Sequence, residues 1–180
     1  MNIDSISKIV ESKPNLSTAL GMHFISVEDE NVCMATMKVD ERNRQPFGFL
    51  SGGASLALAE NLAGVGSSAL CPDKVCMGIS VSGQHVKAVT EGDTVTAHAH
   101  LLSKGRKLHV WLVTITDSEG DLISTVHVTN YITSYNWQDI NHITCRRKNP
   151  LLSNRFTWLI VRFRIIPSPC LLRLVDINHG

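Results

Sequence analysis

Residues 52–70 read GGASLALAENLAGVGSSAL. This run has no proline, is rich in alanine and leucine, and ends just before the pair Cys71-Pro72, so it predicts one long helix. The helix is apolar nearly all round, with Glu60 and Asn61 as the exceptions. A helix of that character is expected to be buried in the core of its domain.

Extended segments flank this helix on both sides. Ahead of it, residues 22–28 and 32–39 alternate between apolar and polar side chains across the short connection DEN, which predicts a β-hairpin. The separators TEGD, SKGRK and DSEGD after the helix have the turn chemistry of further antiparallel hairpins. We therefore expect an α+β domain in which one antiparallel sheet wraps the central helix. The remaining predicted elements are a short amphipathic helix over 4–12 and strands over 75–87, 94–102, 108–116 and 122–132.

Composition indicates a folded, soluble protein. The chain has 180 residues, of which 43% are hydrophobic and 18% charged, enough to bury a core. Its net charge of +1 gives no case for a nucleic acid or an anionic membrane as partner.

The charge is distributed unevenly along the chain. Residues 1–136 carry a net charge of −4 and residues 137–180 carry +5. We predict a domain over 1–136 and an atypical basic tail over 137–180. Four interpretations of this tail remain open. It is an appended strand or membrane-surface segment, a partner-binding tail, a poorly ordered extension, or a stretch translated out of frame.

The cysteines and termini favour a reducing, cytoplasmic location. Five cysteines without a C-x-x-C motif argue against a disulfide framework and against structural zinc. The N-terminus lacks the apolar run of a signal peptide, and no apolar run is long enough to span a bilayer. His98 and His100 alternate on one predicted strand, but no further ligand motif accompanies them, so we expect no metal site.

The residues around the helix start suggest chemistry at a carbonyl group. Gly52 and Gly53 leave free backbone N–H groups at the positive end of the helix dipole, a suitable place to stabilise an oxyanion. Glu60 lies about two turns further along among alanine and leucine, where a carboxylate is costly unless it is paired or faces a cavity. Gln45 precedes the helix in a loop. A solvated stripe made by Glu60 and Asn61 is the structural alternative.

The stretch from Gln45 to Gly64, QPFGFLSGGASLALAENLAG, resembles the hotdog-fold acyl-CoA thioesterases. The similarity is to the branch with phenylacetate-pathway, enterobactin-proofreading and 1,4-dihydroxy-2-naphthoyl-CoA thioesterases. It extends to residues 78–120 and covers roughly residues 16–133. The resemblance implies a sheet wrapped around the helix, a homodimer or homotetramer, and an active site at the subunit interface.

The resemblance also implies roles for individual residues. Glu60 would act as nucleophile or as general base on water, Gln45 would contact the thioester or the attacking group, and the Gly52 N–H would polarise the carbonyl. The family usually has histidine where this chain has Ser51, which can donate one hydrogen bond or cap the helix. Residues similar to the family's substrate-binding positions are His85, Lys87, Ser103, Lys104 and Arg106.

The sequence therefore predicts an acyl-CoA thioesterase that needs no cofactor, since coenzyme A is part of the substrate. Similarity to the naphthoyl branch favours an aromatic acyl group and menaquinone biosynthesis. The alternative is a non-catalytic acyl-CoA-binding hotdog protein in which Ser51 marks lost chemistry. A hotdog dehydratase fits less well, because such enzymes use a catalytic histidine with an acidic partner.

Overall fold

The computed structural model describes residues 1–134, and the predicted tail at 137–180 lies outside this range. The long helix is α3 (Gly52–Leu70), with the predicted bounds. The flanking helix is α1 (Asp4–Glu11). The strands are β1 (Met22–Ile25), β2 (Val32–Lys38), β3 (Val75–His85), β4 (Thr94–Lys104), β5 (Leu108–Thr116) and β6 (Leu122–Thr133).

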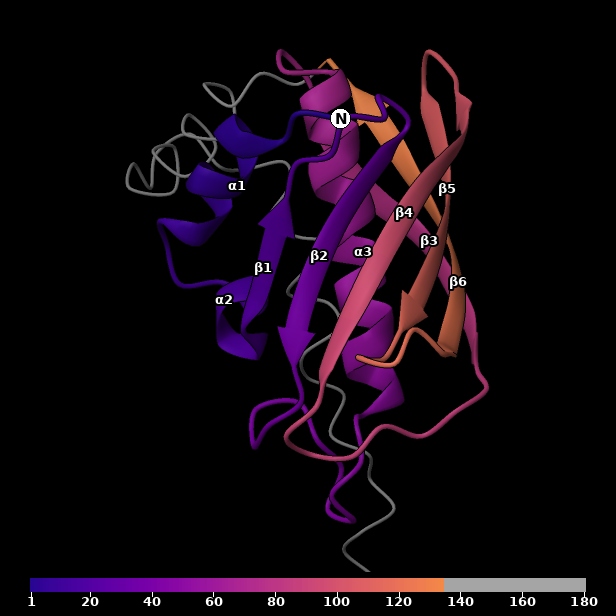
Figure 1. Ribbon diagram of the computed structural model, residues 1–180. Coiled ribbons are helices and arrows are strands. Elements are labelled where there is room, and N and C mark those ends of the chain that lie inside the picture. The colour runs from indigo at the N-terminus through magenta and orange to yellow at the C-terminus, as the bar shows by residue number, and fades with distance from the viewer. Residues whose placement is uncertain (135–180) are drawn as a thin grey trace, which may run out of the picture. The chain divides into compact units, whose positions relative to one another are not determined.

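The strands form one antiparallel sheet that curves around α3 (Figure 1). Their order is β1-β2-β4-β5-β6-β3, which confirms the predicted architecture. The hairpin expected between β3 and β4 is wrong, because β3 pairs with β6 at the far end of the sheet. Gly92 does make the local turn, with φ 99°, but its N–H donates to Val39 O of the segment after β2 (2.9 Å). The turn therefore joins a crossover to β4 rather than two paired strands.

The N-terminal part differs from the prediction in two ways. β1 ends at Ile25 instead of residue 28, because the chain leaves the sheet to bind the N-terminal segment, where Ser26 Oγ accepts from the Ile3 N–H (2.9 Å). A second short helix, α2 (Leu16–Leu20), was not predicted. Its signal was present as a capping box, in which Asn15 and Thr18 exchange side-chain and backbone hydrogen bonds.

The core lies between α3 and the inner face of the sheet. Alternate residues of β2, β4 and β5, among them Ala35, Ala97 and Val113, are fully buried. α3 lies close to the sheet because small side chains face it. A Cβ added at Gly66 would lie 2.7 Å from Trp111 Cη2 and 2.9 Å from Cys33 Sγ, so a larger residue there would push the helix outward. Glycine at this position sets the depth of α3.

No helix within residues 1–134 combines the length and apolarity required to cross a membrane.

Candidate active site

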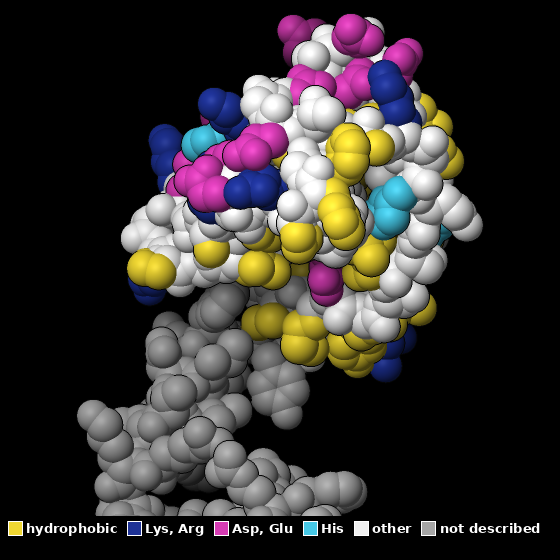
Figure 2. All heavy atoms as spheres, turned by 90° about the horizontal axis from the view of Figure 1, so that it is seen from below, with side chains coloured by type: hydrophobic (Ala, Val, Ile, Leu, Met, Phe, Trp, Pro, Cys, Tyr) yellow, Lys and Arg dark blue, Asp and Glu magenta, His cyan; other side chains and the backbone are white. Residues whose placement is uncertain are grey.

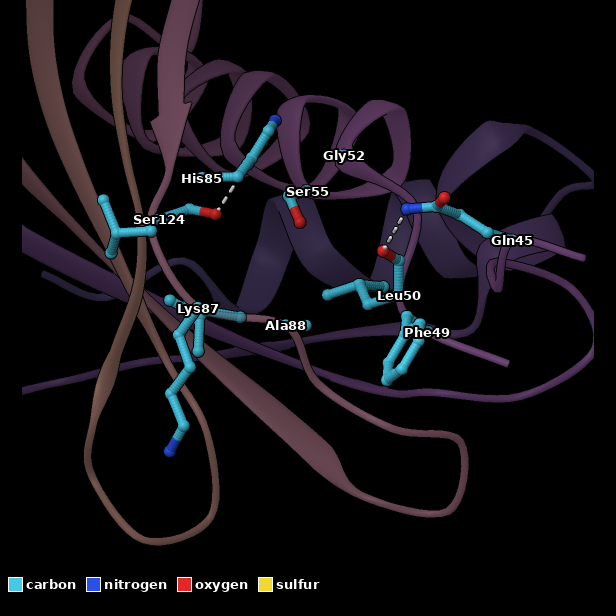
Figure 3. Close-up of a pocket in the computed structure, with 11 residues that line it drawn as sticks. Gln45, Phe49, Leu50, Gly52, Ser55, His85, Lys87, Ala88 and Ser124 are labelled. Carbon is cyan, nitrogen blue, oxygen red and sulfur yellow. Dashed lines mark hydrogen bonds between the residues drawn. The ribbon is translucent and has the colours of Figure 1, made fainter. Parts of the chain in front are cut away.

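A pocket of about 370 Å³ opens beside the first turn of α3. Figure 3 shows that it collects side chains from the loop before α3, from the end of β3 and from β6. Seen from this end in Figure 2, hydrophobic side chains gather near the centre of the face, and most charged side chains lie towards its left and top. The lining residues are Gln45, Phe49, Leu50, Gly52, Ser55, His85, Val86, Lys87, Ala88, Ile123 and Ser124.

Gln45 and Gly52, both predicted from the sequence, meet in this pocket. The loop from Gln45 to Leu50 folds back on itself: the Gln45 N–H donates to Phe49 O (2.6 Å), and Gln45 Nε2 donates to Leu50 O (3.2 Å). The first N–H groups of a helix have no intrahelical acceptor, so the Gly52 N–H is directed towards the open end. The pocket therefore holds an amide side chain beside a helix N-terminus.

His85 lies directly over this helix start. A Cβ added at Gly52 would be 2.7 Å from His85 Nε2, so the ring reaches Gly52 only because glycine leaves room for it. The other ring nitrogen, Nδ1, is 2.8 Å from Ser124 Oγ, and Ser124 is 1% exposed (Figure 3). A buried hydroxyl thus orients the imidazole with Nε2 towards the Gly52 backbone.

Ser51 is the N-cap residue of α3, as one of the two predicted roles requires, but its side chain makes no capping hydrogen bond. The Ser51 N–H donates to Asn43 O (2.9 Å), which fixes the chain as it enters the helix. Ser51 does not line the pocket. Its hydroxyl does not reproduce the long reach of an imidazole at this position.

Lys87 lines the pocket, but its ammonium group turns away from α3 (Figure 3). Its Nζ lies 2.6 Å from Asp117 Oδ2 and 2.7 Å from Asp121 Oδ2. Lys87 lowers the pKa of Asp117, assisted by the backbone N–H groups of Asp121 and Glu119. The carboxylates of Asp117 and Asp121 therefore balance the positive charge of Lys87, the residue that the resemblance places among the substrate-binding positions.

Glu60 lies outside this pocket. It is exposed, and it comes eight residues after Gly52, about 12 Å further along the helix axis. Its carboxylate rests against Gly78 of β3, so closely that an added Cβ at Gly78 would displace Oε1. One chain therefore does not bring Glu60 together with Gln45 and Gly52. The structural alternative, a solvated stripe made by Glu60 and Asn61, holds for Glu60, which is exposed. It does not hold for Asn61, whose Oδ1 accepts a hydrogen bond from Ser17 Oγ (2.9 Å).

A second pocket, of about 380 Å³, lies near the other end of α3. Three cations line it, Lys74, Arg106 and Lys107, together with Tyr131 and the end of β6. Of the three predicted residues in the β4–β5 hairpin, Arg106 is in this pocket, whereas Ser103 and Lys104 are exposed outside it. The arrangement offers positive charge to an anionic ligand.

Residues 1–134 contain no cluster of three or more potential metal ligands.

Comparison with known proteins identifies the family of this chain. Residues 47–124 match the model of the thioesterase superfamily. The proofreading thioesterase EntH of Cronobacter sakazakii is 34% identical over 133 residues, which are 73% of this chain and 90% of that protein. The chain belongs to the thioesterase superfamily. The 1,4-dihydroxy-2-naphthoyl-CoA hydrolase of Listeria monocytogenes is 33% identical over 109 residues, 60% of this chain and 87% of the hydrolase.

Solved structures of thioesterases share the fold. A thioesterase from Haemophilus influenzae superposes with a TM-score of 0.66 at 31% identity, covering 74% of this chain and 91% of that one. A mutant thioesterase from Pseudomonas aeruginosa gives a TM-score of 0.67 at 29% identity, covering 74% and 94%. The sheet around α3 is therefore the hotdog fold of this family, as predicted.

Among the polar residues that line the pocket at the start of α3, sequence reasoning missed Ser55 and Ser124. The Ser55 hydroxyl lies 3.5 Å from Ser51 O within the first turn of α3. Ser124 stands in an ordinary strand pattern, ISTVHV, so no local signal distinguishes it. The pairing of Ser124 with His85 across β6 and β3 is what reveals it.

Replacing Gly78 by alanine should impair the thioesterase without unfolding it. The added methyl group occupies the place of Glu60 Oε1, and the flexible carboxylate must move. We expect kcat to fall on the order of 10–100-fold, because small displacements of a reacting group have effects of this size. Thiol release and thermal unfolding measure the two effects. Ser80→Ala on the same strand is the control and should retain activity; equal activity in both variants would contradict a role for the position of Glu60.

The Lys87–Asp117 pair should make stability depend on pH. The pKa of Asp117 is lowered in the folded protein, so its contribution is present above the ordinary value of 3.8 and is lost as pH falls through the folded pKa. Asp117→Asn is therefore expected to lower the melting temperature by a few degrees at neutral pH. Circular dichroism should show the difference from the native chain shrinking below pH 3.8. A difference that stays constant over this range would exclude the ion pair as its cause.

Proposed function

We propose that this chain hydrolyses acyl-CoA thioesters, with an aromatic acyl group as the preferred substrate, in a site that two subunits share. The observation that carries the proposal is the pocket at the start of α3, where Gln45 and His85 surround the Gly52 backbone. An N–H at the positive end of a helix stabilises the negative charge that develops on a thioester oxygen during attack. Membership of the thioesterase superfamily supports the same reaction.

The missing carboxylate has a source in a second copy of the chain. β3 is the last strand of the sheet, and within residues 1–134 its outer edge pairs with no strand. Met77 and Ile79 are 46% and 60% exposed there. An open edge of this length with apolar side chains is a template for pairing with another strand. We infer a homodimer in which two β3 strands pair antiparallel about a twofold axis.

The position of Glu60 defines the register of that pairing. In one chain Glu60 lies beside Gly78, and Gly52 lies beside His85. A twofold axis between Val81 and Ser82 places Gly78 opposite His85 of the partner subunit. The same operation carries Glu60 to the partner's Gly52 and Gln45. Each dimer then holds two complete sites, each with its carboxylate from one subunit and its oxyanion donor from the other.

This register also gives the second pocket a use. Lys74 stands just before β3, so the twofold axis brings its pocket beside residues 86–89 of the partner subunit, on the rim of the partner's first pocket. Coenzyme A carries a phosphorylated nucleotide at the end remote from its thioester. We propose that Lys74, Arg106 and Lys107 bind these phosphates, while the thioester reaches Gly52 of the partner subunit. Lys87, which is balanced by Asp117 and Asp121, takes no direct part in phosphate binding.

In the reaction that we propose, the acyl carbonyl oxygen accepts a hydrogen bond from the Gly52 N–H. Glu60 of the partner subunit either attacks the carbonyl carbon or removes a proton from an attacking water, and both routes give the free acid and coenzyme A. Gln45 holds the thioester or the water in place. Phe49 and Leu50 line the wall on the side of the acyl group, which suits a flat aromatic substituent.

The experiment that tests this function is thiol release from a panel of acyl-CoAs. Benzoyl-, phenylacetyl- and 1,4-dihydroxy-2-naphthoyl-CoA are compared with aliphatic thioesters of similar size, using the native chain and Ser51→His. We expect turnover by the native chain, highest with an aromatic substrate, and a higher kcat in Ser51→His. Saturable binding without release in either protein would contradict hydrolysis and support a binding protein. Preference for aliphatic substrates would refute the proposed aromatic specificity alone.

A further inference from the structure

Two cysteines lie at the end of α3 that is remote from the candidate active site. Cys71 directly follows the helix, and Cys76 is the second residue of β3. Both are half-buried, whereas Cys33 is fully buried and burial raises its pKa to about 12. Cys71 and Cys76 are thus the described thiols that small reagents can reach, and Cys33 is an internal control.

A buried hydrogen-bond network fixes the proton of the neighbouring histidine. Ser67 Oγ lies 2.9 Å from Trp111 Nε1, 2.9 Å from Asn130 Nδ2 and 3.2 Å from His109 Nδ1. The tryptophan and asparagine atoms can only donate, and they use both acceptor positions of the hydroxyl. Ser67 therefore donates its own proton to His109 Nδ1. Burial, with Lys104 and Lys74 nearby, lowers the pKa of His109, so the ring is neutral and carries its hydrogen on Nε2.

This Nε2–H faces the Cys71 sulfur. The two atoms are 4.0 Å apart, the distance of a weak N–H···S hydrogen bond. The ring cannot turn, because Ser67 holds its other side and His109 is 1% exposed. A fixed donor at this place stabilises negative charge on sulfur while the sulfur attacks an electrophile. His109 is therefore a positioning residue for Cys71.

Cys76 follows Cys71 closely in the chain, at the start of β3. The Cys71 N–H donates to Ser68 O (3.2 Å), and the Ser68 side chain lies near the Cys76 thiol, where it partly offsets the rise in the pKa of Cys76, so both cysteines adjoin one residue of α3. The Lys74 N–H also donates to Cys71 O (3.0 Å), which turns the chain back towards β3. Burial raises the pKa of Cys76, and the neighbouring Cys71 adds to this effect.

We propose that Cys71 and Cys76 form a peroxide-sensitive pair in which Cys71 is oxidised first and Cys76 then closes a reversible disulfide. In the first step the Cys71 sulfur attacks one oxygen of hydrogen peroxide; the O–O bond breaks, a sulfenic acid forms, and one water leaves. In the second step the Cys76 sulfur attacks the sulfenic sulfur, an S–S bond forms, and a second water leaves. Two thiols lose two electrons in total, and peroxide gains them. A reducing thiol reverses the reaction.

Peptide mapping of the full chain tests this proposal without any activity assay. The protein is treated with a small excess of hydrogen peroxide, free thiols are blocked with N-ethylmaleimide, and trypsin is added without a reductant. Cleavage after Arg44, Lys74 and Lys87 separates the two cysteines. We expect peptides 45–74 and 75–87 to appear joined by a disulfide and to separate on addition of dithiothreitol. The Cys33 sulfur itself should carry neither oxygen nor a disulfide, whereas methionines in the same peptide can gain oxygen.

Three variants assign the roles. Cys76→Ser should stop at the sulfenic acid, so that dimedone labels Cys71. Cys71→Ser should leave Cys76 reduced under the same exposure. His109→Gln should slow labelling of Cys71 by on the order of tenfold, with circular dichroism as the check on folding. Oxidation of Cys76 at an unchanged rate in Cys71→Ser would overturn the assignment, and absence of the joined peptides from the native protein would overturn the proposal, wherever else disulfides form.

Discussion

Replacing Glu60 by glutamine is expected to lower kcat for acyl-CoA hydrolysis by about three orders of magnitude, because loss of a catalytic acid or base has effects of about 10²–10⁴-fold. The substitution keeps the size of the side chain and its place beside Gly78, so the fold and KM should change little. Thiol release under steady-state conditions measures kcat and KM separately. The control is Glu28→Gln, which alters an exposed glutamate outside both pockets and should leave kcat unchanged. Full turnover by Glu60→Gln would rule out the mechanism.

Mixing two inactive variants is expected to restore activity. Glu60→Gln and Gln45→Ala each remove a different half of the shared site. In a mixed dimer one site contains both changes, whereas the other contains neither. Equal mixing with random pairing therefore gives about a quarter of native activity. A site contained within one chain gives no recovery, since every chain then carries one defect.

The mixing experiment requires proof that subunits have exchanged. The two variants carry different affinity tags, and the mixed dimers are purified by the two tags in succession before the assay. Mixed dimers that remain inactive would contradict the shared site. A further variant, Ile79→Lys, places a charge on the open edge of β3 and should give an inactive monomer in analytical ultracentrifugation. A monomer with native turnover would contradict the dimer requirement independently.

The sequence predicts the elements of this fold better than their pairing. The composition of α3 gives its bounds directly, since the glycine pair begins the helix and Cys71-Pro72 ends it. The placement of β3 could not be predicted in the same way. Turn residues such as Gly92 report only local backbone geometry, and they do not distinguish a hairpin from the start of a crossover. The pairing of strands that are distant in the sequence depends on which strand faces are buried against each other in the core. A short stretch of sequence does not contain this information.

The candidate site shows the same division. Gln45, Gly52 and His85 line one pocket, whereas Glu60 lies outside it, and in the function that we propose it acts from a second chain. Lys87 fits the pattern of a substrate-binding cation, but Asp117 and Asp121 arrive from a distant turn and balance its charge. Ser124 gives no sequence signal because its importance lies in one contact, with His85, made across two strands. Spacing reveals groups on one element, and tertiary contacts decide what those groups do.

The close contact between Gly66 and Trp111 has a consequence for how this enzyme could acquire new substrates. Glu60 stands on the same helix as Gly66, so the depth of the carboxylate is set by packing in the core and not by the loop that carries Phe49. In the function that we propose, substitutions in that loop reshape the acyl pocket while the carboxylate stays in place. Because the carboxylate and the pocket wall lie on different segments, a substitution in the wall leaves the carboxylate in place. Selection can therefore change the substrate range through single substitutions that each preserve hydrolysis.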